Sequence, residues 1–172
     1  MLEAIGVASE IGWGQMVAFG TISVGVGHVL AGRIGRGIRL LEGVIAAYDA
    51  RGEIVYANST KIALAEIYLE MLTSPARPPL SIIFRNLGMV LRVKFSGVRR
   101  IEALLEQAGR SPHLHECGAI RASINMKIGL LHELKKEADL ARQFLEKARA
   151  PAEHHGATVL VTKIDAALAE LH

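Results

Sequence analysis

The sequence of 172 residues contains little cysteine, few aromatic residues and few prolines. Cys117 is the only cysteine, so an internal disulfide is impossible and a reducing compartment such as the cytoplasm is expected. Aromatic residues make up 5% of the chain and hydrophobic residues 51%, which favours aliphatic packing between helices over an aromatic-rich β-sandwich. A chain of this length can bury a hydrophobic core without a disulfide or a metal.

Strong charge of one sign is also missing, because the formal net charge is only +3. This value is far from that of a dedicated nucleic-acid-binding protein, so nucleic acid is disfavoured as a partner. Glu3 and Glu10 stand where a secretory signal would carry Lys or Arg. Residues 11–32 lack Asp, Glu, Lys and Arg, but six glycines and four polar side chains interrupt their apolar character. We therefore expect a buried helix there and not a membrane partner.

Helical periodicity recurs along the chain, whereas alternating strand patterns are absent, and this predicts an all-α fold. Ile38, Leu41 and Ile45, for example, share one face of an amphipathic helix. Glycines and prolines mark the expected breaks, among them Gly52 and Pro151. The predicted helices cover residues 2–11, 14–31, 34–50, 54–72, 80–94, 96–109, 114–133, 136–150 and 153–171.

The short connections predict antiparallel helical hairpins that stack in order within one domain, residues 1–172. A hairpin that exposes apolar surface at both ends is unstable alone, so neighbouring hairpins must share a core. The expected repeats cover residues 14–50, 54–109 and 114–150, and a terminal helix follows at 153–171.

A recurring pattern of small and large residues resembles the tetratricopeptide repeat, in which small residues let paired helices approach and large ones fill the facing gap. The better copy comprises Ile128, Gly129, His132, Ala141, Leu145 and Ala148. An earlier copy has the same offsets at Val24, Gly25, His28, Gly32, Gly37, Leu41 and Val44. Partial copies lie at Leu64, Ala65 and Tyr68 and at Ile101, Leu105 and Ala108. Histidine replaces the usual tyrosine in both fuller copies, and the resemblance implies a right-handed superhelix.

A second resemblance concerns residues 37–42, 64–70, 100–105 and 165–171, which are rich in leucine, alanine and glutamate. They look like the carboxyl-terminal helical repeats of large bacterial signalling proteins that carry a class III adenylate or guanylate cyclase domain. No Walker-type sequence and no pair of metal-binding aspartates in a strand context occurs here. The resemblance implies a regulatory appendage or relative of such a protein, without catalysis of its own.

The tetratricopeptide register predicts which side chains face the groove, because the first helix of each pair lines the concave side. The expected groove residues are Phe19, Ile22, Val26, Ile62, Glu66, Met126, Leu130 and Glu133. Most of them are apolar, which suits a protein or peptide segment with hydrophobic anchors. Ordinary core packing is the competing interpretation. Exposed repeat ends also leave a homodimer possible.

Three arginines recur every seven residues at Arg85, Arg92 and Arg99 and could line one face if the helices run on. This pattern supports an alternative function, in which a nucleic acid or a phosphate group binds the basic face from Arg85 to Arg100. Only Phe84 and Phe95 are close enough to stack on bases. A solvated helix face explains the same charges without a ligand.

His113, His115 and Cys117 form the one cluster with metal-ligand character. Their spacing differs from that of structural zinc sites, and a second ligand pair is missing. Cys117 as a nucleophile would require a base and an orienting group, which the sequence does not supply. We therefore predict no catalytic residue, no metal and no cofactor.

Overall fold

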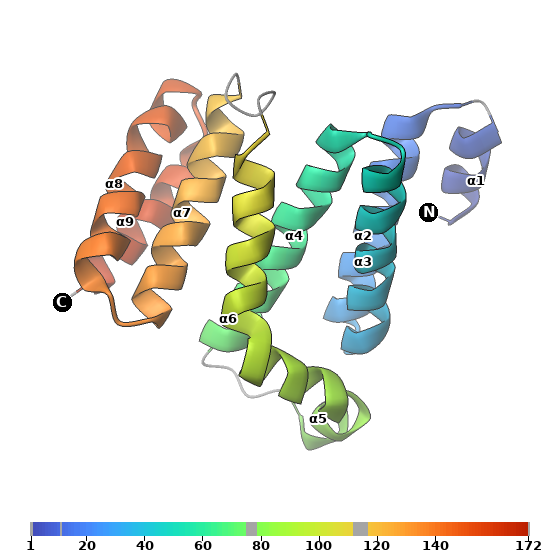
Figure 1. Cartoon of the computed structure of the whole chain (residues 1–172), viewed down its shortest axis with the longest axis horizontal. Helices are drawn as coiled ribbons and strands as arrows, with labels where there is room; N and C mark the ends of the chain where they lie inside the picture. The colour runs from blue at the N-terminus through green and yellow to red at the C-terminus, as the bar shows by residue number, and fades with distance from the viewer. Residues whose placement is uncertain (1, 11, 75–78, 112–116, 172) are drawn as a thin grey trace.

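The computed structural model describes residues 2–10, 12–74, 79–111 and 117–171, and within these ranges the chain forms nine helices (Figure 1). This confirms the predicted all-α class. None of these helices is both long and apolar enough to cross a membrane. The helices are α1 (Leu2–Glu10), α2 (Gly14–Leu30), α3 (Ile34–Ala50), α4 (Ile54–Thr73), α5 (Leu80–Arg85), α6 (Leu87–Gly109), α7 (Gly118–Leu134), α8 (Ala138–His154) and α9 (Thr158–Glu170).

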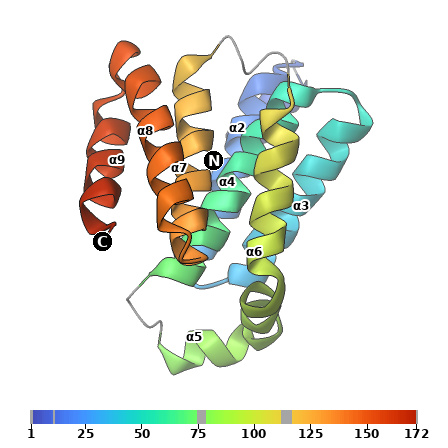
Figure 2. The ribbon, with the colours of Figure 1, turned by 60° about the vertical axis from the view of Figure 1, so that its left-hand side comes forward.

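The helices pack as sequential antiparallel neighbours, and α2–α3, α4–α6 and α7–α8 form the closest pairs. The alternate helices α2, α4, α7 and α9 also contact one another in turn, so they form one row against which α3, α6 and α8 lie. The two ends of the chain therefore lie at opposite ends of the array (Figure 1). The short helix α5 lies at the start of α6 (Figure 2), and it contacts the rest of the fold through Ile82, which packs against the central core, and through Arg85.

Five of the connections share one three-residue turn whose middle residue has a positive φ. In the turn between α3 and α4, the Gly52 amide donates to the Asp49 carbonyl and the Glu53 amide to the Tyr48 carbonyl, which satisfies the carbonyls at the end of α3. A left-handed residue at this position is the reason for glycine in four of the five turns. The middle residues are Gly12, Gly32, Gly52, Lys136 and Gly156.

Small residues lie where the paired helices touch, as the repeat pattern predicted. A Cβ atom on Gly37 of α3 would lie 2.5 Å from the Gly25 carbonyl oxygen of α2. A Cβ atom on Gly129 of α7 would lie 2.7 Å from Leu145 of α8. Large aliphatic side chains fill the space around these contacts, and Leu41 and Leu145 are both fully buried.

The predicted break near residue 95 is wrong, because α6 runs without interruption from Leu87 to Gly109. The break falls at Asn86, whose buried side chain holds the turn between α2 and α3. Its Oδ1 accepts from the Gly35 amide at 3.1 Å, and its Nδ2 donates to the carbonyls of Gly32 and Ile82 at 2.9 and 2.8 Å. Asn86 thus competes for backbone groups at the point where the helix would otherwise continue.

The predicted break at Pro151 is also wrong, because this proline lies within α8. It lies in the last turn of the helix, so the one hydrogen bond that it cannot donate, to the carbonyl of Lys147, is lost where only three more helical residues follow. The helix ends three residues later at His154, and the turn at Gly156 then leads into α9, which begins at Thr158 and not at 153. The expected start of a helix at 114 lies outside the described residues, and α7 is described from Gly118.

Candidate functional site: a groove between α4, α7 and α9

Two adjacent depressions lie along the row of alternate helices, between α4, α7 and α9. Their volumes are about 290 and 430 Å³, and both are lined by Glu66, Met126, Lys127 and Lys163. The floor of the smaller one includes apolar side chains from all three helices, namely Leu69, Met126, Leu130 and Ala167. Together they form a groove with an apolar floor and charged residues at its edges, which we call the α4–α7–α9 groove.

An ion-pair network crosses this groove around Lys127, whose side chain is only 4% exposed. Its Nζ lies 3.3 Å from Oε2 of Glu66 and donates to the Ser123 hydroxyl at 3.0 Å. Lys163 of α9 approaches the other oxygen of Glu66 at 3.8 Å. A buried ammonium without a partner is costly, so Glu66 holds α4, α7 and α9 together as well as lining the groove.

Glu70 of α4 and Glu170 of α9 line the smaller depression, and Glu133 of α7 lies close enough to Glu170 to interact with its charge. None of these three carboxylates makes an ion pair within the described residues. Burial raises the pKa of Glu133, and the negative charge of Glu170 raises it further. Two acidic groups that disfavour each other's charge leave a local negative potential. This end of the groove is therefore electrostatically suited to a cation.

The predicted groove residues separate into two groups. Glu66, Met126 and Leu130 come together in the groove, and Glu133 lies beside Glu170 at its edge. Ile22 and Val26 are half-buried against the central core, and Ile62 packs against residues of α6 and α7. Phe19 on α2 is 49% exposed, on the row of alternate helices but outside the depressions.

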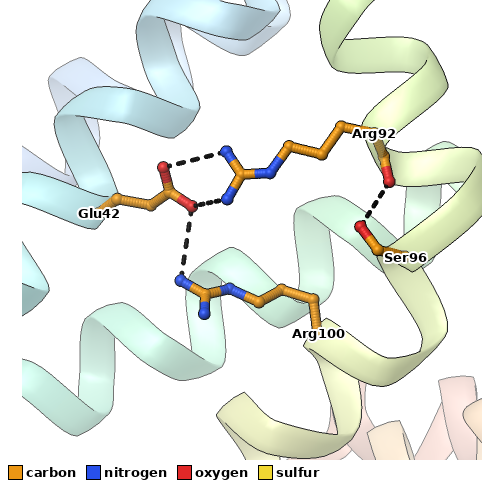
Figure 3. A network of polar contacts seen from close by, with 4 residues as sticks. All are labelled: Glu42, Arg92, Ser96 and Arg100. Carbon is orange, nitrogen blue, oxygen red and sulfur yellow. Dashed lines mark hydrogen bonds and ion pairs between the residues drawn. The ribbon is translucent and has the colours of Figure 1, made fainter.

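The predicted basic face is largely engaged in contacts within the chain (Figure 3). Arg85 lies on α5 and donates to the Gly32 carbonyl at 2.9 Å. Arg92 of α6 pairs with Glu42 of α3 at 2.9 Å, and Arg100 reaches the same carboxylate at 3.4 Å. Because the helix breaks at Asn86, the three predicted arginines do not form one continuous free row.

A smaller depression of about 270 Å³ adjoins this ion-pair network and is lined by Arg92, Arg99, Arg100 and Tyr68. Tyr68 is 1% exposed, and its hydroxyl makes no hydrogen bond of good geometry among the described residues, although the Arg100 guanidinium group lies beside it. Burial raises the pKa of Tyr68, as does Glu42, while Arg92 and Arg100 oppose the change. A buried phenol beside three guanidinium groups could donate a hydrogen bond to an anion.

Of the histidine and cysteine residues named in the sequence analysis, His132 has a packing role within the fold. His132 stacks on Phe144 of α8 with a 5.3 Å separation of ring centroids, and its Nδ1 lies 2.6 Å from Oε2 of Glu137. His132 therefore packs against the paired helix, as predicted. Cys117 is exposed at the start of α7. His113 and His115 lie outside the described residues.

Comparisons of the chain with protein-family models, with curated proteins and with solved structures find no match. The class of protein therefore follows from the fold alone. Within the residues that the structure describes, it is an all-helical protein whose helices pack as sequential pairs.

Proposed function

We propose that this chain is a tetratricopeptide-like binding module whose right-handed stack of hairpins presents the α4–α7–α9 groove to a protein segment. Two features support the repeat assignment. The hairpins α2–α3 and α7–α8 place small residues at equivalent contact points, and the alternate helices share one row. In this proposal the module regulates or scaffolds a signalling protein of the cyclase type and performs no covalent step.

The observation that carries the proposal is the combination of an apolar floor with unpaired carboxylates at one end of the groove. An apolar floor binds hydrophobic anchors, and the carboxylates select the charge of the partner. The preferred partner is therefore a short segment, helical or extended, with one or two large apolar residues and a neighbouring Lys or Arg. An acidic segment would be repelled.

The test selects peptides from a random displayed library on the purified chain and measures each peptide by fluorescence anisotropy. We expect the selected peptides to combine apolar residues with Lys or Arg. The double variant Glu70→Lys/Glu170→Lys changes two exposed carboxylates of the groove and should weaken binding about tenfold or more. Glu10→Lys/Glu146→Lys makes the same change of charge at two exposed positions outside the groove and should bind like the parent.

Two results would overturn this proposal. One is the selection of acidic peptides, and the other is equal loss of affinity in both double variants. Glu66 is left unchanged in these experiments because its removal would strand the buried ammonium of Lys127 and confuse folding with binding.

A second candidate function is the binding of a phosphate group in the depression beside Tyr68, favoured by the three arginines that line it. Calorimetric titration with inorganic phosphate tests it. Arg99→Glu should abolish the binding heat, whereas Tyr68→Phe should reduce it. If neither variant changes a measurable affinity, or if phosphate does not bind, this candidate is excluded.

A further inference from the structure

Large apolar side chains are exposed along α5 and the first half of α6. On α6, Leu87, Leu91 and Phe95 recur every four residues on one side, and Leu80 and Phe84 have the same spacing on α5. Phe84 and Phe95 are 72% and 76% exposed, well above the exposure expected of a phenylalanine that only packs within the fold. A cluster of this kind marks an interaction surface, and we call these five residues the α5–α6 apolar stripe.

The segment of sequence that carries the stripe has charges of one sign only. Residues 71–101 include six Lys or Arg and no Asp or Glu. Arg92 and Arg100 share Glu42, but Lys94 and Arg99 make no ion pair within the described part of the chain. Lys94 lies one helical turn after Leu91, and Arg99 lies one turn after Phe95, so both free cations adjoin the stripe.

The shape of this region narrows the choice of partner. In both views α5 and the start of α6 extend beyond the ends of the neighbouring helices and form a projecting edge (Figures 1 and 2). The five stripe residues, which belong to these two helices, are all exposed. A projecting edge with long apolar side chains and basic neighbours is suited to entering a soft anionic phase. Its net positive charge opposes the pairing of this surface with a second copy of itself.

We propose that α5 and the first half of α6 bind the surface of a membrane that contains anionic lipids. The α5–α6 apolar stripe enters the boundary between head groups and acyl chains, and Lys94 and Arg99 contact the lipid phosphates. The helices lie in the plane of the interface and do not span the bilayer. The α4–α7–α9 groove is formed by other helices, so it remains free to bind a protein segment while the membrane is bound.

Co-sedimentation of the full chain with lipid vesicles tests this inference. One set of vesicles is phosphatidylcholine alone, and the other contains roughly one third phosphatidylserine. We expect binding to the mixed vesicles, with an affinity about tenfold or more above that for phosphatidylcholine, and a decrease as salt is raised. Phe84→Asp/Phe95→Asp should lose this binding, whereas Val159→Asp, at an equally exposed valine on α9, should retain it.

Circular dichroism and thermal unfolding establish that each variant is folded. If the phenylalanine variant does not fold, Lys94→Glu/Arg99→Glu at two exposed positions provides the second test and should also lose binding. The inference is overturned if the parent binds both kinds of vesicle equally or neither. It is also overturned if free phosphate at millimolar concentration displaces the chain completely, or if the phenylalanine variant only dissociates a dimer seen by light scattering.

Discussion

The hairpins α2–α3 and α7–α8 both have small residues where their two helices touch, but the residues differ between them. In both, a small residue of the first helix faces the second helix, at Gly25 in one and Gly129 in the other. The facing residue of the second helix is Gly37 in the earlier hairpin and Ala141, which is fully buried, in the later one. The earlier hairpin thus brings two backbones into contact, and the later one needs glycine on one side only.

This difference shows where each hairpin can tolerate an added methyl group. At Gly37 the nearest atom is the Gly25 carbonyl oxygen, which belongs to the backbone of α2 and cannot move without separating the helices. At Gly129 the nearest atoms belong to the side chain of Leu145, which can rotate. We therefore expect the same substitution to cost more in α3 than in α7.

The largest effect is expected for Gly37→Ala. A Cβ atom there lies 2.5 Å from the Gly25 carbonyl oxygen and 2.6 Å from Val29, so α2 and α3 must shift apart. We expect a loss of about 2 kcal/mol in the free energy of unfolding, even though alanine favours the helix more than glycine does. Denaturant unfolding followed by circular dichroism measures it.

Gly43→Ala in the same helix is the matched control, because Gly43 is exposed and a Cβ atom there meets no atom within 4 Å. It should stabilise the chain by about 0.5–1 kcal/mol through helix propensity alone. Equal effects at Gly37 and Gly43 would show that the close contact between α2 and α3 is not formed.

Gly129→Ala should have a smaller effect in the other hairpin. The added Cβ lies 2.7 Å from Cγ of Leu145 and 3.2 Å from the Ala141 carbonyl oxygen. Because Leu145 can adjust, we expect a loss of about 1 kcal/mol in the same unfolding measurement. A loss as large as that of Gly37→Ala would mean that the Leu145 side chain cannot adopt another rotamer to make room for the methyl group.

The two hairpins also differ in their turns, and this predicts a gain in stability. Lys136 is the only residue other than glycine with a positive φ in the described part of the chain, and it is exposed. Lys136→Gly relieves this conformation and should add about 0.5 kcal/mol to the free energy of unfolding. The opposite change at the exposed Gly52, in the turn of the same kind between α3 and α4, is Gly52→Lys, and it should remove a similar amount. If Lys136→Gly destabilises instead, the left-handed turn is not the native conformation.

Periodicity and glycine placement predicted most of the fold, because these patterns act locally and the turns repeat. Asn86 was not predicted as a break, since its role depends on the carbonyl of Gly32 and the amide of Gly35, which are distant in sequence. Pro151 was misread because the effect of proline depends on how many residues of the helix follow it. Both errors concern long-range or end-of-helix effects that a local pattern does not contain.

The candidate site was predicted in part. The repeat register was enough to find Glu66, Met126 and Leu130, because it gives the face of each first helix. Lys127 and Glu170 were not predicted as site residues. A lysine next to a predicted groove residue is normally solvated, and only the fold shows that Lys127 is buried against Glu66. The exposed stripe on α5 and α6 was hidden by the wrong break near Phe95.

The smallest effect concerns the acidic end of the groove, through Glu133→Gln. The pKa of Glu133 is raised in the folded chain, first by burial and then by Glu170, so its charge opposes folding. The folded state therefore holds the proton more tightly than the unfolded state, and the destabilisation appears as the pH rises through the carboxyl range. At neutral pH the variant should be more stable than the parent by a few tenths of a kcal/mol. The advantage should disappear on acidification, when the parent carboxyl is also neutral.

Glu146→Gln, an exposed change on α8 outside the groove, controls for the change in net charge. A stabilisation that is equal in both variants, or independent of pH, would remove the electrostatic argument for a cationic partner at this end of the groove.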